Sequence, residues 1–82
     1  MNYNKFDIIT FDDNNKVVVL EKIEYEGTTY LYVDKVNQEE TNTLKKFHIL
    51  RVDNDYLQKE TDTEILTNIL PLFSNKIKLE DI

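Results

Sequence analysis

The chain has 82 residues and a formal net charge of −6, because 16 Asp and Glu residues outnumber 10 Lys and Arg residues. This length allows one small domain and excludes two, and the acidic balance disfavours direct nucleic-acid binding. With 40% hydrophobic residues and no cysteine, the chain can build one modest core but neither a disulfide framework nor a thiolate zinc site.

The first residues lack the apolar stretch of a signal peptide, and the longest apolar run, residues 17–20 (VVVL), is far too short to span a membrane. These features predict a cytoplasmic protein that makes no membrane contact. The many Asn, Ile and Lys residues have A/T-rich codons and Ala is absent. This bias indicates a low-G+C bacterium or one of its mobile elements as the source.

Two strands are predicted in the first third of the chain. Residues 7–11 (DIITF) form the first, and the Asp and Asn residues at 12–15 supply turn chemistry. The second strand, residues 17–25, changes the phase of its alternation, since Val18 and Leu20 are on one parity and Ile23 and Tyr25 on the other. A β-bulge near residues 21–22 would bring both pairs to a common face.

A tight turn at Glu26-Gly27 leads into a third strand, residues 28–35, whose β-branched and aromatic side chains suit a pleated surface. Its alternation places Leu31 and Val33 on one face and Tyr30 and Tyr32 on the other. After a polar loop, residues 45–52 (KKFHILRV) carry apolar groups on both faces, which predicts a central strand. Residues 56–60 supply a short fifth strand on the sheet edge.

The carboxy-terminal helix is predicted over residues 62–77. Thr61 and Glu64 fit the capping box, and apolar residues then recur at helical spacing to form one wide stripe. The stripe comprises Ile65, Leu66, Ile69, Leu70, Phe73 and Ile77. Pro71 lies inside it, and because the stripe continues in phase, we expect one helix kinked near Pro71 rather than two separate turns.

The residues needed for catalysis or cofactor binding are missing from the sequence. His48 is the only histidine, Ser74 is the only serine, and the carboxylate pairs lie in predicted turns, loops or the tail. A calcium loop starting at Asp53 fails because Leu57 and Gln58 occupy positions that need an oxygen ligand and a glycine. Gly27 alone cannot form a phosphate-binding loop. We therefore predict no catalytic residues, no metal, no cofactor and no enzyme activity.

The tyrosines Tyr25, Tyr30, Tyr32 and Tyr56 form the candidate protein-contact surface. If the helix covers the face of Leu31 and Val33, Tyr30 and Tyr32 emerge on the opposite face. Tyrosine is favoured at protein interfaces because it joins an apolar ring to a polar tip. The alternative is ordinary cross-strand packing of half-exposed tyrosines.

The hairpin 23–31 (IEYEGTTYL), the acidic loop after it, the segment 49–52 (ILRV) and the capped terminal helix together resemble a bacterial family, domain of unknown function 1292. The resemblance covers roughly residues 7–75. It implies a short, acidic, cytoplasmic protein of low-G+C Gram-positive bacteria, with no established activity or catalytic residues.

Together these patterns predict a single α+β domain over residues 1–82, a four- to five-stranded antiparallel β-meander with one helix packed on one face. The predicted role is a binding or regulatory accessory module that contacts another protein through the uncovered sheet face or an edge strand, as a monomer or weak homodimer. The alternative is a phage or mobile-element inhibitor that uses its acidic side chains to mimic nucleic acid on a basic protein.

Overall fold

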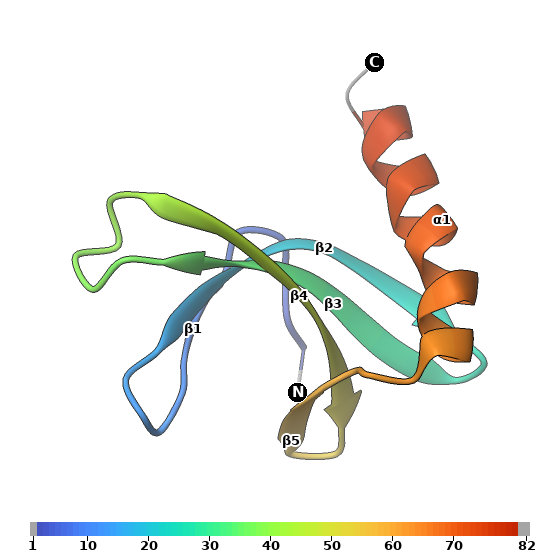
Figure 1. Cartoon of the computed structure of the whole chain (residues 1–82), viewed down its shortest axis with the longest axis horizontal. Helices are drawn as coiled ribbons and strands as arrows, with labels where there is room; N and C mark the ends of the chain where they lie inside the picture. Colours follow the sequence, from blue (N-terminus) through green and yellow to red (C-terminus); the bar gives the residue numbers. More distant parts are fainter. Residues whose placement is uncertain (1, 81–82) are drawn as a thin grey trace.

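The computed structural model describes residues 2–80 and shows five strands followed by one helix (Figure 1). The elements are β1 (Ile8–Thr10), β2 (Lys16–Tyr25), β3 (Thr28–Val36), β4 (Thr43–Asp53), β5 (Tyr56–Lys59) and α1 (Thr63–Glu80). The strands pair antiparallel with their sequence neighbours, in the order β1-β2-β3-β4-β5. The predicted α+β meander with a terminal helix is therefore confirmed, including the short fifth strand.

The central strand of the sheet is β3, and β4 lies between β3 and β5. The expectation that residues 45–52 form the central strand is therefore wrong by one position in the sheet. Both faces of β4 are nevertheless buried at Ile49 and Leu50, because Ile49 packs in the cluster with the helix and Leu50 packs in the cluster on the other face of the sheet.

The β2–β3 ladder contains the predicted bulge. Val19 pairs with Val33, but Glu21 pairs with Tyr32, so Leu20 is the extra residue. Before the bulge, Val18 lies opposite Asp34, and after it Ile23 lies opposite Tyr30, which places Val18 and Ile23 on the same face as predicted. The shift also turns Glu21 toward that face.

The curled sheet builds a core on each of its faces. We call the face of Leu31 and Val33 the inner face: Val17, Val19 and Leu50 join them there, and Ile9, Phe11 and Leu57 pack against this cluster. We call the opposite face the helix face, because Ile69 and Phe73 of α1 bury Ile23, Tyr30 and Ile49 there.

The helix therefore does not cover Leu31 and Val33. It covers the face of Tyr30 and Tyr32, so the condition under which these two tyrosines would emerge uncovered is not met. The physical reason is that the sheet curls, so that Ile9 and Phe11 at one end and Leu57 at the other cover the inner face themselves. Only the helix face then remains for the apolar stripe of α1 to bury.

The cap of α1 is Asp62 rather than Thr61. The Asp62 side chain accepts hydrogen bonds from the backbone N–H groups of Glu64 (2.9 Å) and Ile65 (3.3 Å), as an N-cap residue does. The predicted capping box of Thr61 and Glu64 is therefore wrong: the N-cap is Asp62, and Ile65 three residues on has no carboxylate to complete a box. The helix then continues as one element through exposed Pro71, past its predicted end at residue 77.

Across residues 2–80, α1 is the sole helix, and it is not both long enough and apolar enough to cross a membrane.

Candidate binding groove beside the helix

The structure separates the four tyrosines of the predicted contact surface. Tyr30 is only 4% exposed and belongs to the core between the sheet and α1, where Tyr25 and Tyr32 pack against the same cluster as half-buried residues. Tyr56 is 71% exposed and lies at the start of β5. The four side chains thus form no common surface: Tyr32 lines two hollows beside the helix, and Tyr56 lines a third elsewhere.

Tyr32 is the centre of an aromatic cluster under the helix. Its ring stacks on Phe47 of β4, with centroids 5.5 Å apart and an interplanar angle of 16°. On its other side, the ring of Phe73 lies tilted at 5.8 Å. These contacts fix the position of Tyr32, because offset and tilted ring pairs are favoured arrangements of aromatic side chains.

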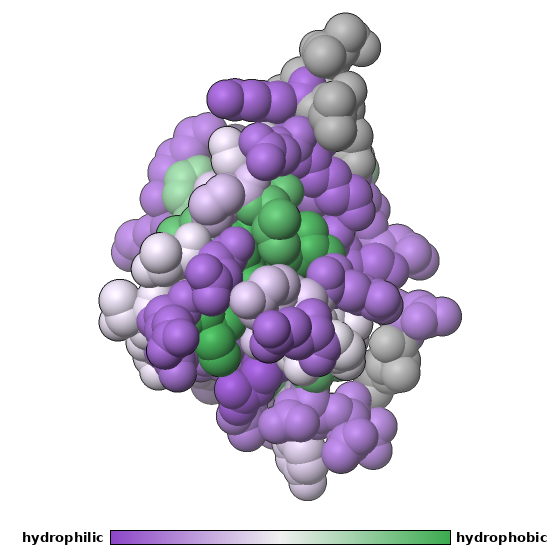
Figure 2. All heavy atoms as spheres, turned by 90° about the vertical axis from the view of Figure 1, so that its right-hand side faces the viewer, coloured by the Kyte–Doolittle hydropathy of each residue, from purple (hydrophilic) through white to green (hydrophobic). Residues whose placement is uncertain are grey.

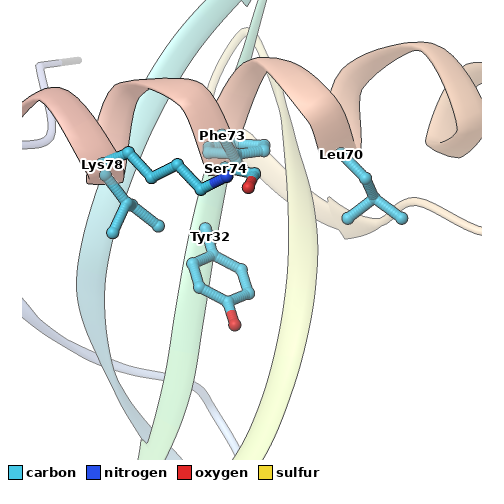
Figure 3. Close-up of a pocket in the computed structure, with 6 residues that line it drawn as sticks. Tyr32, Leu70, Phe73, Ser74 and Lys78 are labelled. Atoms are coloured by element: carbon cyan, nitrogen blue, oxygen red, sulfur yellow. The ribbon is translucent and has the colours of Figure 1, made fainter.

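One hollow, of about 420 Å³, opens beside Tyr32 and α1. Figure 3 shows Tyr32 below the helix, with its hydroxyl pointing away from α1, with Phe73 above it and with Leu70 and Lys78 on either side along α1. Ser74 and Ile77 complete the lining. Apart from the Ser74 hydroxyl, the Tyr32 hydroxyl and the Lys78 ammonium, the lining side chains are apolar.

A second hollow, of about 290 Å³, adjoins the first because both are lined by Tyr32 and Leu70. Its other walls come from Phe47, His48 and Ile49 of β4, from Lys59 and Glu60 at the end of β5, and from Leu66 of α1. We call the two hollows together the helix groove, defined by Tyr32, Phe47, Leu66, Leu70, Phe73 and Ile77.

The helix groove exposes apolar surface that a small domain would ordinarily bury. Leu70 is 47% exposed and Phe47 is 46% exposed. Viewed from the helix side, the molecule shows an apolar patch surrounded by hydrophilic side chains (Figure 2). A contiguous exposed apolar patch with a polar rim is typical of an interaction site.

Buried charges hold α1 at the carboxy-terminal end of the groove. Glu21, turned toward the helix face by the bulge, lies 3.4 Å from the Lys76 ammonium and 3.5 Å from that of Lys5. The Lys76 ammonium also donates a 2.7 Å hydrogen bond to the carbonyl of Lys22. This arrangement ties the second half of the helix to β2.

A second buried carboxylate, Glu60, fixes the start of the helix. It lies 3.6 Å from the guanidinium of Arg51 and accepts hydrogen bonds from the backbone N–H groups of Thr61 (3.1 Å) and Asp62 (3.5 Å). The chain thereby turns sharply from β5 into α1. Both ends of the groove are thus held by charged groups, while its walls are apolar.

His48 does not form part of a catalytic arrangement of side chains. It alternates with Phe47 and Ile49 and so points to the inner face, and the pKa of its imidazole is lowered by burial and by the positive charges of Lys59 and Lys35. Glu60 is the one carboxylate that shares a hollow with it. Within residues 2–80, no three His, Asp or Glu side chains are grouped so that they could hold a metal ion.

Tyr56 lies in a separate hollow of about 440 Å³ on the inner face, where the end of β1 approaches the β4–β5 turn. Tyr3 and Phe11 add aromatic rings to this hollow, and Asp12 and Asp55 add carboxylates. Its mixed lining contrasts with the apolar lining of the helix groove.

The sequence reasoning identified Tyr32 but missed Phe47, Leu70 and Phe73 as residues of the groove. The sequence did contain a signal for these residues. The apolar stripe of the helix is wider than the surface that one face of the sheet can bury. Ile69 and Phe73 are buried, whereas Leu70 on the flank of the same stripe remains half exposed.

Neither a scan against protein-family models nor searches of curated proteins and of solved structures found a match to this chain. The resemblance to the family domain of unknown function 1292 therefore stays a prediction.

Proposed function

We propose that this protein is a non-catalytic binding module that acts by contact with another protein, and that the helix groove is its contact surface. The observation that carries this proposal is the continuous apolar lining from Phe47 to Ile77, with Leu70 left 47% exposed at its centre. Exposed apolar surface of this kind stabilises a complex when a partner removes it from water.

The lining favours a protein partner over a small polar metabolite. Sites for small molecules combine apolar walls with several polar groups that converge on the ligand. In the helix groove the polar groups are divided between the two hollows: Ser74 and Lys78 line one, His48, Lys59 and Glu60 line the other, and Tyr32 lines both. Apolar and aromatic side chains of a partner match the long middle stretch.

The groove is also preorganised, which lowers the entropic cost of binding. The Glu21 and Glu60 contacts hold the two ends of α1, and the Tyr32 ring is held between Phe47 and Phe73. A partner therefore meets a surface whose walls are already in place.

A matched pair of leucines in α1 tests the proposal. Leu70 is 47% exposed and lines both hollows, whereas Leu72 is 40% exposed and lines neither hollow of the groove. We expect Leu70→Asp to abolish the capture of partner proteins from bacterial lysate, because an aspartate would be desolvated in the complex. Leu72→Asp should capture the same proteins as the wild type, and circular dichroism should show that both variants are folded.

Equal capture by wild type, Leu70→Asp and Leu72→Asp would contradict the groove as the contact surface. A double Tyr30→Ser/Tyr32→Ser variant is unsuitable here, because Tyr30 is a buried core residue whose truncation destabilises the fold itself.

A further inference from the structure

The amino-terminal half of β4 is an open edge of the sheet. β4 runs from Thr43 to Asp53, but β5 pairs only with Leu50–Asp53. On its other side β4 pairs with β3 at Thr43 and again over residues 47–52, with an irregularity between them where Lys45 has a φ of 57°. Beyond the end of β5, the first half of β4 therefore has a neighbour on one side only, within the part of the chain that the structure describes.

Phe47 presents the hydrogen-bonding groups of this open edge. The carbonyl of Ile49 accepts a 2.9 Å hydrogen bond from the N–H of Glu60, so the polar backbone groups of Ile49 point away from β3. Residues two apart in an antiparallel strand point their backbone groups the same way. The N–H and C=O of Phe47 therefore point outward where β5 no longer runs alongside.

The second hollow of the helix groove lies directly at this open edge. Phe47 forms one wall, while Lys59 and Glu60, where β5 ends, and Leu66 and Leu70 of α1 form the others. A strand added beside Phe47 would therefore place a side chain between β4 and the helix. An apolar side chain matches this lining.

The opposite side of the same edge is positively charged. Lys46 alternates with Phe47 and so points to the inner face, where Lys59 lies across from Leu50. No ion pair joins Lys46 or Lys59 to another described residue, whereas Lys5, Lys16, Arg51 and Lys76 all have acidic partners. In a chain of net charge −6, this edge is a local concentration of unpaired positive charge.

We propose that the open edge of β4 takes up an extended segment of the partner protein as an added antiparallel strand, with an apolar side chain in the groove and acidic residues on either side of it. This inference rests on the proposed function and names the kind of partner. The backbone groups of Phe47 supply the pairing, the hollow beside Leu66 and Leu70 takes the apolar side chain, and Lys46 and Lys59 attract the flanking carboxylates.

The charge argues against a second copy of this chain as the occupant. Two open edges paired about a two-fold axis at Phe47 would place Lys46 of both copies on the same face of the joined sheet, one on either side of the axis, and like charges this near destabilise a strand pair. An acidic partner strand meets no such repulsion.

The test uses the synthetic peptide Thr-Glu-Thr-Glu-Leu-Glu-Thr-Glu-Thr and isotope-labelled protein in an NMR titration. We expect the amide signals of Phe47 and its strand neighbours to shift. The same peptide with Lys in place of every Glu should bind at least about tenfold more weakly, and N-methylation of the central Leu should weaken binding by about tenfold through loss of its hydrogen bond to Phe47.

Reversing the charges of Lys46 and Lys59 distinguishes strand addition at this edge from nonspecific binding. The double variant Lys46→Glu/Lys59→Glu, checked for folding by circular dichroism, should prefer the Lys peptide over the Glu peptide, reversing the wild-type order. Unchanged preference in this variant, or no effect of N-methylation, would overturn the inference. Shifts confined to α1 would overturn it too, because they would indicate docking on the helix alone.

The outcomes also distinguish this inference from the proposed function. If Leu70→Asp abolishes partner capture but the captured protein binds equally well to Lys46→Glu/Lys59→Glu, the groove is the contact surface and the acidic strand is wrong. If Leu70→Asp, Lys46→Glu and Lys59→Glu all leave capture unchanged, the proposed function itself fails.

Discussion

Glu21 is a buried carboxylate that joins three separate segments of the chain. It lies within ion-pair distance of Lys5 in the amino-terminal segment and Lys76 in the helix, and its own position is in β2. Because both lysines are partly exposed, each pair contributes less than a fully buried pair would. One carboxylate therefore links the amino-terminal segment, β2 and α1.

We expect Glu21→Gln to lower the free energy of unfolding by about 1–3 kcal/mol, since the neutral amide loses the attraction of both lysines. Glu24→Gln is the matched control, because Glu24 is an exposed acid in the same strand and should change the stability by less than about 0.5 kcal/mol. Urea unfolding measures both. Equal effects would show that the position of Glu21 under the helix is unimportant.

The largest error of the sequence prediction concerned which face of the sheet the helix covers. Tyr30 and Tyr32 were assigned by alternation to one face, correctly, but alternation does not say which face the helix covers. That choice depends on the curl of the sheet, which brings Ile9 and Leu57, far apart in the chain, onto one cluster. No local pattern encodes this contact.

At the scale of elements, the start of α1 illustrates how close a local signal can come. The residues from Thr61 to Glu64 predicted a helix start, yet the N-cap is Asp62. Glu60 accepts the hydrogen bonds of the Thr61 and Asp62 N–H groups, and Asp62 accepts that of Glu64. The Glu60 and Glu64 carboxylates could both accept a hydrogen bond from the N–H of Thr61, and Glu60 takes it. Glu60 is held there by Arg51, a residue distant in the chain, so the local sequence does not predict the outcome.

Asp62→Ala should therefore destabilise the protein by about 1 kcal/mol, as loss of an N-cap does, with a reduced helical signal in circular dichroism. Thr61→Ala should have a clearly smaller effect, because no hydrogen bond from the Thr61 side chain to the helix is present in residues 2–80. The reverse order of the two effects would restore the capping box expected from the sequence.

The strands were predictable because their signals are local. The turn at Glu26-Gly27 has positive φ at both residues, 50° and 79°, as a tight hairpin requires. The phase change in β2 predicted a bulge near residues 21–22, and the extra residue is Leu20, directly before them. The helix groove was not predictable in the same way, since Tyr32, Phe47 and Leu70 come from three elements whose contact depends on the whole fold.

At the scale of the whole molecule, charge is distributed unevenly in a way that composition hides. The net charge of −6 suggested either a uniformly solvated surface or a mimic of nucleic acid. Several acids are instead paired or buried, such as Glu40 with Lys16 and Glu60 with Arg51, while Lys46 and Lys59 stand without acidic partners among the described residues. This arrangement favours an acidic partner at the β4 edge over a basic one.

The stability of the whole domain should fall as the pH drops from 7 toward 5.5. Burial and the neighbouring lysines lower the pKa of His48 below its usual 6.5, so the unfolded chain takes up its proton at a higher pH than the folded chain does. The stability that neutral His48 contributes is therefore present above pH 6.5 and is lost as the pH falls toward the lowered folded pKa.

His48→Gln should flatten this part of the profile, measured as the urea midpoint at pH 7 and pH 5.5. All other ionisable groups are the same in the two proteins and should affect wild type and variant alike. A midpoint difference that persists unchanged in His48→Gln would assign the pH dependence to other groups.

The extra residue at Leu20 lets side chains of the same parity in β2 serve opposite faces of the sheet. Upstream of it, Val17 and Val19 serve the inner core, and downstream, Glu21 and Ile23 serve the helix side. Deletion of Leu20 would leave Val19 opposite Val33 and Glu21 opposite Tyr32 in a regular ladder, so both halves of the strand would keep their faces. In its evolution β2 can therefore lose this one residue without turning any other side chain to the opposite face.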